Sequence, residues 1–241
     1  MRTTEPRRIL CLAAIILVLA GCAPAKVRTS AAPGIEQYNV QTIVVMPFER
    51  LMTPQILDSP DPEFSVPRGA RRSDISVMVP PPSPEKLDLQ TVTVPPYAPE
   101  KVTQIMYRKL RKREGILVLP LDEATRAAQS LGGKKGEFPE QMAKEVAKKL
   151  GADAALVGRV LVYREREGSK WGARPAIVGF EVKLIGADGE ILWTADYYEK
   201  QRPMIEDIAG FLERRGVFVT AEELAEYGAE RIVRKFPFGN L

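Results

Sequence analysis

The chain has 241 residues, of which 45% are hydrophobic, and its formal net charge at pH 7 is only +4. A balance this close to neutral argues against a nucleic-acid-binding protein, because such proteins normally carry a strongly basic surface. The chain contains no histidine, which excludes Ser-His-Asp and Cys-His catalysis and histidine-ligated metal sites.

Residues 1–22 have the three-part organisation of an export signal. A basic start precedes an apolar run over residues 9–20, which is too short to span a membrane and fits a secretory signal. The run leads into Leu19-Ala20-Gly21-Cys22, which resembles the lipobox of bacterial lipoprotein precursors. The resemblance implies a signal peptide over residues 1–21, cleaved between Gly21 and Cys22, and a diacylglyceryl cysteine at position 22 that is also acylated by a fatty acid such as palmitate. The alternative is an ordinary signal peptide with a cysteine there by chance.

Lipid on Cys22 would decide where the protein resides. One acyl chain holds a protein at a membrane only marginally, whereas two or more give stable attachment. An aspartate after the lipidated cysteine favours retention in the inner membrane of enteric bacteria, and this chain has Ala23 there. The resemblance therefore implies an outer-membrane lipoprotein that faces the periplasm. Cys11 leaves with the signal, so the mature chain keeps no thiol for a disulfide.

The segment after the lipobox divides into a tether and the start of a folded domain. Residues 22–39 are short and polar and contain prolines, so we expect them to be a lipidated tether. Residues 40–48 are apolar and rich in β-branched side chains, which predicts a buried strand. We expect one α/β domain to extend from residue 40 to residue 241.

A proline-rich insertion over residues 53–99 is expected after this first strand. Two of its segments, Val77-Met78-Val79 and Val92-Thr93-Val94, echo each other, and each precedes prolines. Paired, they would form a projecting hairpin arm, and the alternative is an extended loop without fixed structure. In either form the insertion is the best candidate for an interaction element, and its candidate partner contacts are Val77, Val79, Val92 and Val94.

A regular pattern of helices and strands follows Pro99. Apolar residues at helical spacing predict helices over residues 100–113, 122–131 and 137–150, with a short strand over 116–119. Strands are expected over 154–164, 177–185 and 190–200, the last two joined by an Asp188-Gly189 turn. Helices over 204–214 and after Thr220, where Glu223 completes a capping box, end the chain. This order predicts an α/β (α+β) fold with a mixed β-sheet covered by helices, a C-terminal β-hairpin and C-terminal helices.

The sequence offers no convincing catalytic, metal or cofactor site. Residues 83–86 match the S-x-x-K motif of penicillin-binding enzymes, but they lie in a proline-rich stretch and no K-T-G accompanies them. Carboxylate pairs such as Asp122/Glu123 fall at predicted helix starts, where negative charge is favourable. Trp171 lies in a polar, glycine-rich connection between two strands. It is either an anchor for a protein partner or a cap on the edge of the core.

Two motifs resemble those of a group of outer-membrane lipoproteins. Residues 151–160 (GADAALVGRV) follow a predicted helix, and residues 188–193 (DGEILW) close the predicted hairpin. Both are similar to elements of the curli-secretion-channel and penicillin-binding-protein-activator (LpoB-like) lipoproteins. The resemblance covers about residues 40–200. It implies a domain without an enzymatic site that binds proteins, regulates cell-wall synthases or assembles into rings.

We therefore predict a non-enzymatic, lipid-anchored periplasmic adaptor or scaffold of the outer membrane that binds another envelope protein. The alternative is a subunit of an oligomeric outer-membrane export assembly, which would make the chain a homo-oligomer. A third hypothesis is a hydrolase of envelope polymers, which would have to rely on carboxylates alone.

Overall fold

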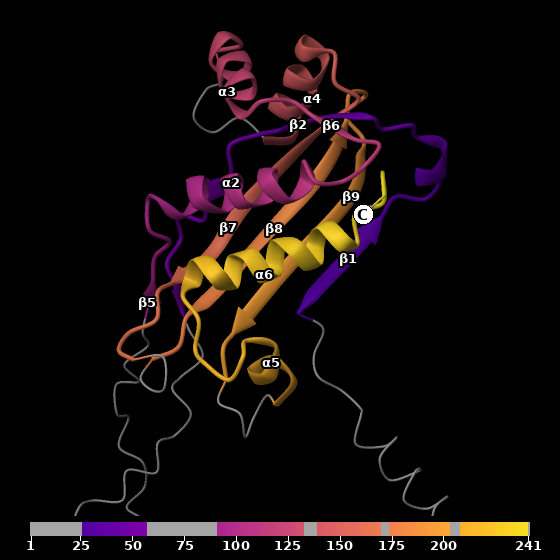
Figure 1. Cartoon of the computed structure of the whole chain (residues 1–241). Coiled ribbons are helices and arrows are strands. Elements are labelled where there is room, and N and C mark those ends of the chain that lie inside the picture. Colours follow the sequence, from indigo (N-terminus) through magenta and orange to yellow (C-terminus); the bar gives the residue numbers. More distant parts are fainter. Residues whose placement is uncertain (1–25, 57–90, 133–138, 170–173, 203–207, 241) are drawn as a thin grey trace, which may run out of the picture.

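A mixed seven-stranded β-sheet forms the centre of the computed structural model, which describes residues 26–56, 91–132, 139–169, 174–202 and 208–240 (Figure 1). Its strands are β1 (Val27–Ala31), β2 (Thr42–Val45), β3 (Glu49–Arg50), β6 (Leu117–Val118), β7 (Ala154–Arg164), β8 (Ile177–Gly186) and β9 (Ile191–Lys200). The order across the sheet is β1-β9-β8-β7-β2-β6, with β3 also paired to β7. Strand β2 is parallel to β6 and β7, whereas β7, β8, β9 and β1 are antiparallel in succession. The predicted α/β fold is confirmed.

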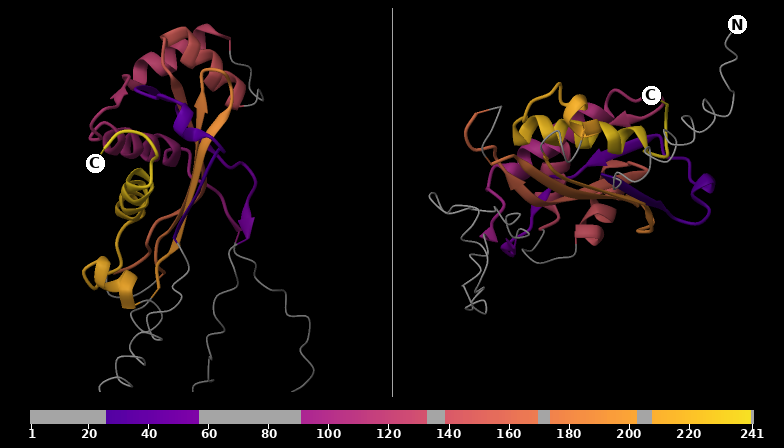
Figure 2. Two further views of the ribbon diagram at one scale, coloured as in Figure 1. Left: turned by 90° about the vertical axis from the view of Figure 1, so that its right-hand side faces the viewer. Right: turned by 90° about the horizontal axis from the view of Figure 1, so that it is seen from below.

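Helices cover the two faces of this sheet unequally. Helices α2 (Ala98–Leu110) and α6 (Ala221–Arg234) lie side by side on one face (Figures 1 and 2). Helices α3 (Leu121–Ser130) and α4 (Pro139–Leu150) form a second, smaller core with the other face at one end of the sheet. The short helix α5 (Ile208–Glu213) lies at the opposite end. A 3-10 turn, η1 (Ile35–Gln37), follows β1.

Helices α2 and α6 form where the sequence pattern predicts them. The apolar residues whose helical spacing predicts α2 are fully buried: Val102, Ile105, Met106 and Leu110. Helix α6 begins with the predicted capping box, in which the Glu223 backbone N–H donates to Thr220 Oγ1 over 3.2 Å and the Thr220 N–H donates to the Glu223 carboxylate over 2.8 Å. Four ion pairs join the two helices along their length: Lys101–Glu222, Arg108–Glu226, Lys109–Glu226 and Lys109–Glu230.

The predicted C-terminal hairpin is also present, with one correction. Strands β8 and β9 pair antiparallel and are joined at Asp188-Gly189, as expected. Trp193, Ala195 and Tyr197 face the core, but Ile191, which strict alternation along the strand predicts on the same face, is 43% exposed. The pairing register shifts between Leu184 and Ile185, and this irregularity breaks the alternation.

Part of the predicted tether belongs to the sheet. Val27–Ala31 form the edge strand β1, which pairs antiparallel with β9. Val27 is buried in this strand, and the other four residues are exposed. A strand with one inward apolar residue shows too little alternation to be recognised from sequence. This corrects the expectation that a tether extends to residue 39.

The proline-rich insertion is shorter than predicted. Strands β4 (Gln55–Ile56) and β5 (Thr91–Val92) pair antiparallel at its base, with Ile56 opposite Thr91. Beyond β5, Val94 and Ala98 are buried in the main core. Residues 91–99 therefore belong to the folded domain and not to the insertion. Val77 and Val79, the other half of the predicted hairpin arm, lie outside the described residues.

Deleting residues 57–90 is expected to leave the domain folded. An Asn-Gly dipeptide between Ile56 and Thr91 would give the β4–β5 pair a two-residue turn. A shorter loop also costs less entropy to close, so the free energy of unfolding should not fall. Urea denaturation followed by circular dichroism measures the change. Deleting residues 53–99 removes the core residues Val94 and Ala98 and should prevent folding; equal stability of the two deletions would contradict this boundary.

Candidate functional site

The structure describes only two of the side chains predicted as functional. Val92 is partly exposed in β5, and Val94 is buried in the main core. Val94 is therefore not available as a partner contact, because its apolar side chain is used in packing. Gly21, Cys22, Val77, Val79 and Trp171 lie outside the described residues, so their predicted roles stay predictions.

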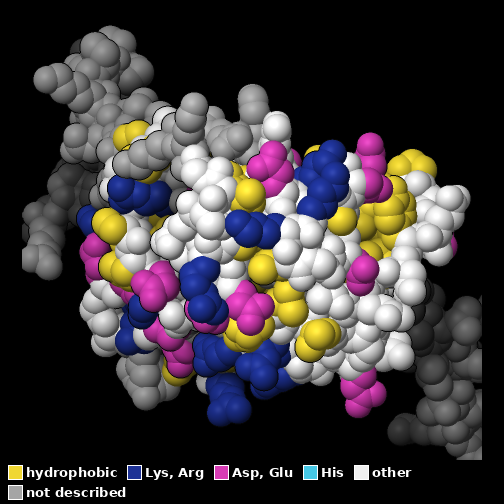
Figure 3. All heavy atoms as spheres, turned by 90° about the horizontal axis from the view of Figure 1, so that it is seen from above, with side chains coloured by type: hydrophobic (Ala, Val, Ile, Leu, Met, Phe, Trp, Pro, Cys, Tyr) yellow, Lys and Arg dark blue, Asp and Glu magenta, His cyan; other side chains and the backbone are white. Residues whose placement is uncertain are grey.

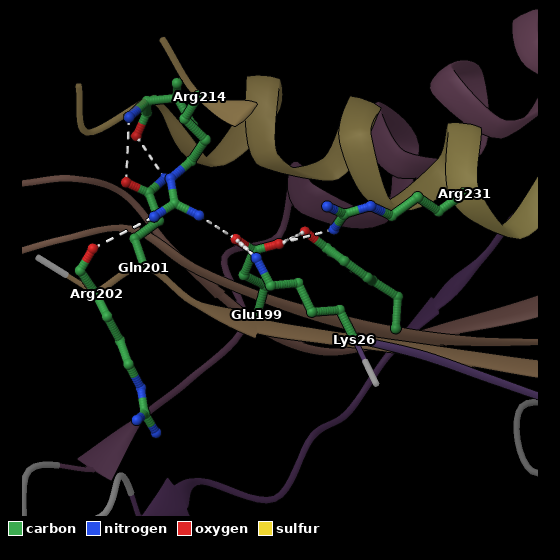
Figure 4. A network of polar contacts seen from close by, with 8 residues as sticks. Lys26, Glu199, Gln201, Arg202, Arg214 and Arg231 are labelled. Carbon is green, nitrogen blue, oxygen red and sulfur yellow. Dashed lines mark hydrogen bonds and ion pairs between the residues drawn. The ribbon is translucent and has the colours of Figure 1, made fainter. Parts of the chain in front are cut away.

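Among the described residues, Lys26 is the nearest to Cys22 along the sequence. It belongs to a buried polar cluster around Glu199 (Figure 4). Glu199 lies near the end of β9 and its side chain is 3% exposed. It is reached by Lys26 from before β1, by Arg214 from directly after α5 and by Arg231 from α6. The cluster therefore joins the start of the described chain to three C-terminal elements. We call these four residues the Glu199 cluster.

Both carboxylate oxygens of Glu199 accept hydrogen bonds from this cluster and from the neighbouring Tyr197. Oε1 accepts from Lys26 Nζ over 2.9 Å and from Arg214 Nη1. Oε2 accepts from the Tyr197 hydroxyl over 2.8 Å and from Arg231 Nη1 over 3.2 Å. Burial, and then the charge of Glu199, raises the pKa of Tyr197, so the hydroxyl stays protonated and remains a donor.

Neighbouring backbone groups extend the cluster to the loop that precedes α6. Arg214 Nη2 donates to the carbonyl of Arg202 over 3.3 Å. The side-chain amide of Gln201 donates to the carbonyl of Val219 and accepts from its N–H. A carboxylate with both oxygens bonded and three cations around it is held in place, so the arrangement serves as a structural link between these elements.

A tight approach of α6 to β9 positions the same cluster. Gly228 lies over Tyr197, and a Cβ atom at this position would be 2.3 Å from the Tyr197 ring. A glycine is therefore required for α6 to pack closely enough to bring Arg231 to Glu199.

A second candidate site is a groove at the other end of the domain, between α4 and the β8–β9 turn. It has a volume of about 680 Å³. Its lining is charged and polar: Glu140, Gln141, Lys144, Glu145, Lys148, Asp188, Gly189 and Glu190. Figure 3 shows this end of the molecule, where acidic and basic side chains are interspersed. We call it the α4 groove.

Hydrogen bonds hold two of the carboxylates in the α4 groove. Lys183 Nζ donates to Glu140 over 2.7 Å, and this bond lowers the pKa of the Glu140 carboxyl, which therefore stays ionised at neutral pH. Asp188 accepts from the Tyr38 hydroxyl over 3.2 Å and from the Glu190 N–H over 3.0 Å. Small-molecule sites are mostly apolar and enclosed, so this open, charged groove is better suited to a polar protein surface.

The GAD motif that carries the resemblance has a structural role here. Gly151 ends α4 with a positive φ of 65°, a conformation that favours glycine. The Asp153 carboxylate then accepts from the N–H groups of Gln41 and Thr42 over 2.9 and 2.8 Å. It thereby fixes the start of β2 beside the start of β7, so the motif specifies the fold of the sheet.

Within the described ranges, no group of three or more His, Cys, Asp or Glu side chains is placed to hold a metal ion. Among the helices of the described residues, none combines the length and the apolar character needed to cross a membrane.

The Glu199 cluster was not predicted from the sequence, although one signal for it is present there. The alternation that buries Trp193, Ala195 and Tyr197 also places Glu199 on the covered face of the sheet. A carboxylate at an inward position requires cationic partners. Their identity could not be read from the sequence, because Lys26 is 173 residues away from Glu199.

Comparison with known proteins gives similarities in structure alone. No family model matches the chain, and no curated protein matches its sequence. Among solved structures, the chain is similar to a PelC dodecamer subunit from Paraburkholderia phytofirmans, with a TM-score of 0.43 and 14% identity over 86% of this chain and 93% of that one. It is also similar to the LpoB C-terminal domain from Salmonella enterica, with a TM-score of 0.38 and 10% identity over 68% of this chain and 89% of that one. A third similar structure is lipoprotein GNA1162 from Neisseria meningitidis, with a TM-score of 0.34 and 12% identity over 72% of this chain and 94% of that one. Similarities at this level assign the chain to none of these families.

Proposed function

We propose that this protein is a lipid-anchored periplasmic adaptor of the outer membrane, held by Cys22, whose domain binds another envelope protein at the α4 groove. One observation carries the proposal. The described chain begins at Lys26 on the α5 end of the sheet, four residues after Cys22, whereas the α4 groove lies at the opposite end. The domain thus has one end suited to a membrane and another suited to a partner.

The length of the sheet separates these two ends. Strand β7 has 11 residues and runs from the α4 end toward the α5 end. At about 3.3 Å per residue it spans roughly 36 Å. An anchor at the α5 end would therefore present the α4 groove to the periplasm at about this distance from the bilayer.

The anchor is tested by metabolic labelling with a clickable palmitate analogue. Wild-type protein should incorporate the label and Cys22→Ser should not. The reason is that the lipids are attached to two groups of Cys22: its sulfur and the amino group that cleavage of the signal peptide exposes. Cys11→Ser is the matched control and should keep the label, since Cys11 leaves with the signal peptide. A mature product with an unmodified Cys22 thiol would overturn the anchor.

The partner surface is tested by photo-crosslinking in intact cells. A benzoylphenylalanine placed at Gln141 or Lys148, both exposed in the α4 groove, should give a discrete adduct with one envelope protein. The same group at Arg28, which is exposed on β1, is the control and should not give that adduct. Identical adducts from all three positions would show that the groove is not the contact surface.

A second candidate function is a subunit of an oligomeric export assembly. The observation that favours it is β1, which is an edge strand of the described sheet and therefore has a neighbouring strand on one side only. Such an edge can pair with a strand of another copy. Light scattering of detergent-extracted protein separates the two functions, because an adaptor that acts alone should be monomeric and an assembly subunit should have a multiple of the monomer mass.

A further inference from the structure

Helix α5 exposes apolar side chains at the end of the domain where the anchored chain begins. Ile208 is 62% exposed and Leu212 is 66% exposed. Residues four apart lie on the same face of a helix, so the two side chains form one small apolar surface. Apolar residues grouped on an exposed face commonly mark a protein or membrane contact.

The chain between the lipid and the domain is too short to let this end move far from the bilayer. Four residue steps separate Cys22 from Lys26. At about 3.3–3.6 Å per residue they reach at most roughly 14 Å. A single helix with its side chains is about 10–12 Å thick, so this gap admits no partner thicker than one helix between α5 and the membrane.

The Glu199 cluster ties α5 to the point where the anchor joins the domain. Lys26 and Arg214 both bond to Glu199 Oε1, and Arg214 follows α5 directly. Close to it, Arg202 and Arg215 are exposed, and the Arg202 side chain points away from the cluster in Figure 4. Guanidinium groups at this end are suited to lipid phosphates, as on the polar side of interfacial helices.

We propose that α5 lies in the lipid headgroup region, with Ile208 and Leu212 directed toward the acyl chains. This proposal rests on the lipidation of Cys22 described under the proposed function. It makes the α5 end a second, non-covalent membrane contact that fixes the orientation of the domain, so that the α4 groove points away from the bilayer.

Site-directed spin labelling of the lipidated, full-length mature protein tests this orientation. Cys22 is modified and Cys11 is removed, so an introduced cysteine is the sole free thiol. Nitroxide labels at Ile208→Cys and Leu212→Cys are compared with a label at Leu117→Cys, which is 61% exposed on β6 at the far end. The protein is placed in vesicles of phosphatidylethanolamine and phosphatidylglycerol.

The labels at positions 208 and 212 should collide with oxygen severalfold more often than the label at 117, because oxygen concentrates in lipid. They should collide less often than the label at 117 with a water-soluble nickel complex. Equal nickel accessibility at all three positions in protein that carries the lipid by mass spectrometry would overturn the docking of α5 while leaving the anchor intact. Protein that carries no lipid at Cys22 would overturn the anchor, and the docking with it. Shielding from both oxygen and nickel would indicate a protein contact at α5 and would also overturn the proposal.

Discussion

Replacing Glu199 with glutamine is expected to lower the free energy of unfolding by about 3–5 kcal/mol, the range measured when one member of a buried ion pair is removed. The substitution keeps the shape of the side chain but leaves Lys26, Arg214 and Arg231 without their shared carboxylate. Arg214 loses most, because its side chain is only 2% exposed and cannot be rehydrated without opening the structure. A domain of this size is stable by only about 5–15 kcal/mol, so the variant should be close to the limit of folding.

The matched control is Glu226→Gln on the exposed side of α6. Glu226 also pairs with more than one cation, Arg108 and Lys109, but its side chain is 40% exposed. Exposed ion pairs contribute about 0–1 kcal/mol. Urea denaturation of detergent-solubilised protein, followed by circular dichroism, compares the two variants. Equal losses of stability would show that burial of the Glu199 cluster does not matter.

Replacing Arg113 with methionine is expected to destabilise the domain by about 2–4 kcal/mol, since each buried group that loses its partner costs about 1–3 kcal/mol. Arg113 is buried, and its guanidinium donates to four backbone carbonyls at the end of α6 and beyond it: those of Val233, Phe236, Phe238 and Gly239. Burial lowers the pKa of this guanidinium, but arginine remains charged at neutral pH. The positive charge also complements the negative end of the helix dipole.

Lys112→Met is the control for this prediction, because Lys112 is the adjacent basic residue and is exposed. Its substitution should change the free energy of unfolding by no more than about 0.5 kcal/mol. Hydrogen exchange adds a local measurement: Arg113→Met should speed exchange of the amides from 233 to 240 more than those of β7. A uniform increase in exchange rate across the molecule would argue against a specific role of Arg113 at the C-terminus of α6.

Elements with a strong, self-contained pattern could be predicted from the sequence. Strand β7 was predicted at its observed bounds, and α6 was predicted from its capping box. The β8–β9 hairpin followed from alternation on both sides of Asp188-Gly189. In each case the residues that decide the structure are neighbours along the chain, so local periodicity is sufficient.

Elements whose stability depends on distant partners were missed. Strand β1 is held by its pairing with β9, and the β4–β5 pair joins residues on opposite sides of a long insertion. The roles of the basic residues at the end of α2 could not be predicted either. Arg108 and Lys109 pair with α6, and Arg113 is buried against the C-terminus, whereas Lys112 is exposed. These interactions depend on how helices pack, which local spacing does not encode.

The pairing of β1 with β9 limits the order in which the chain can fold. The first described residues contact Glu199 and Lys235, which are synthesised late: Lys26 is 173 residues before Glu199, and the Lys235 ammonium bonds the Val27 carbonyl across 208 residues. The N-terminal edge of the sheet can therefore close only after most of the polypeptide has been made. A product truncated before Glu199 would lack the docking partners of its own first strand, which would leave that strand open to proteases.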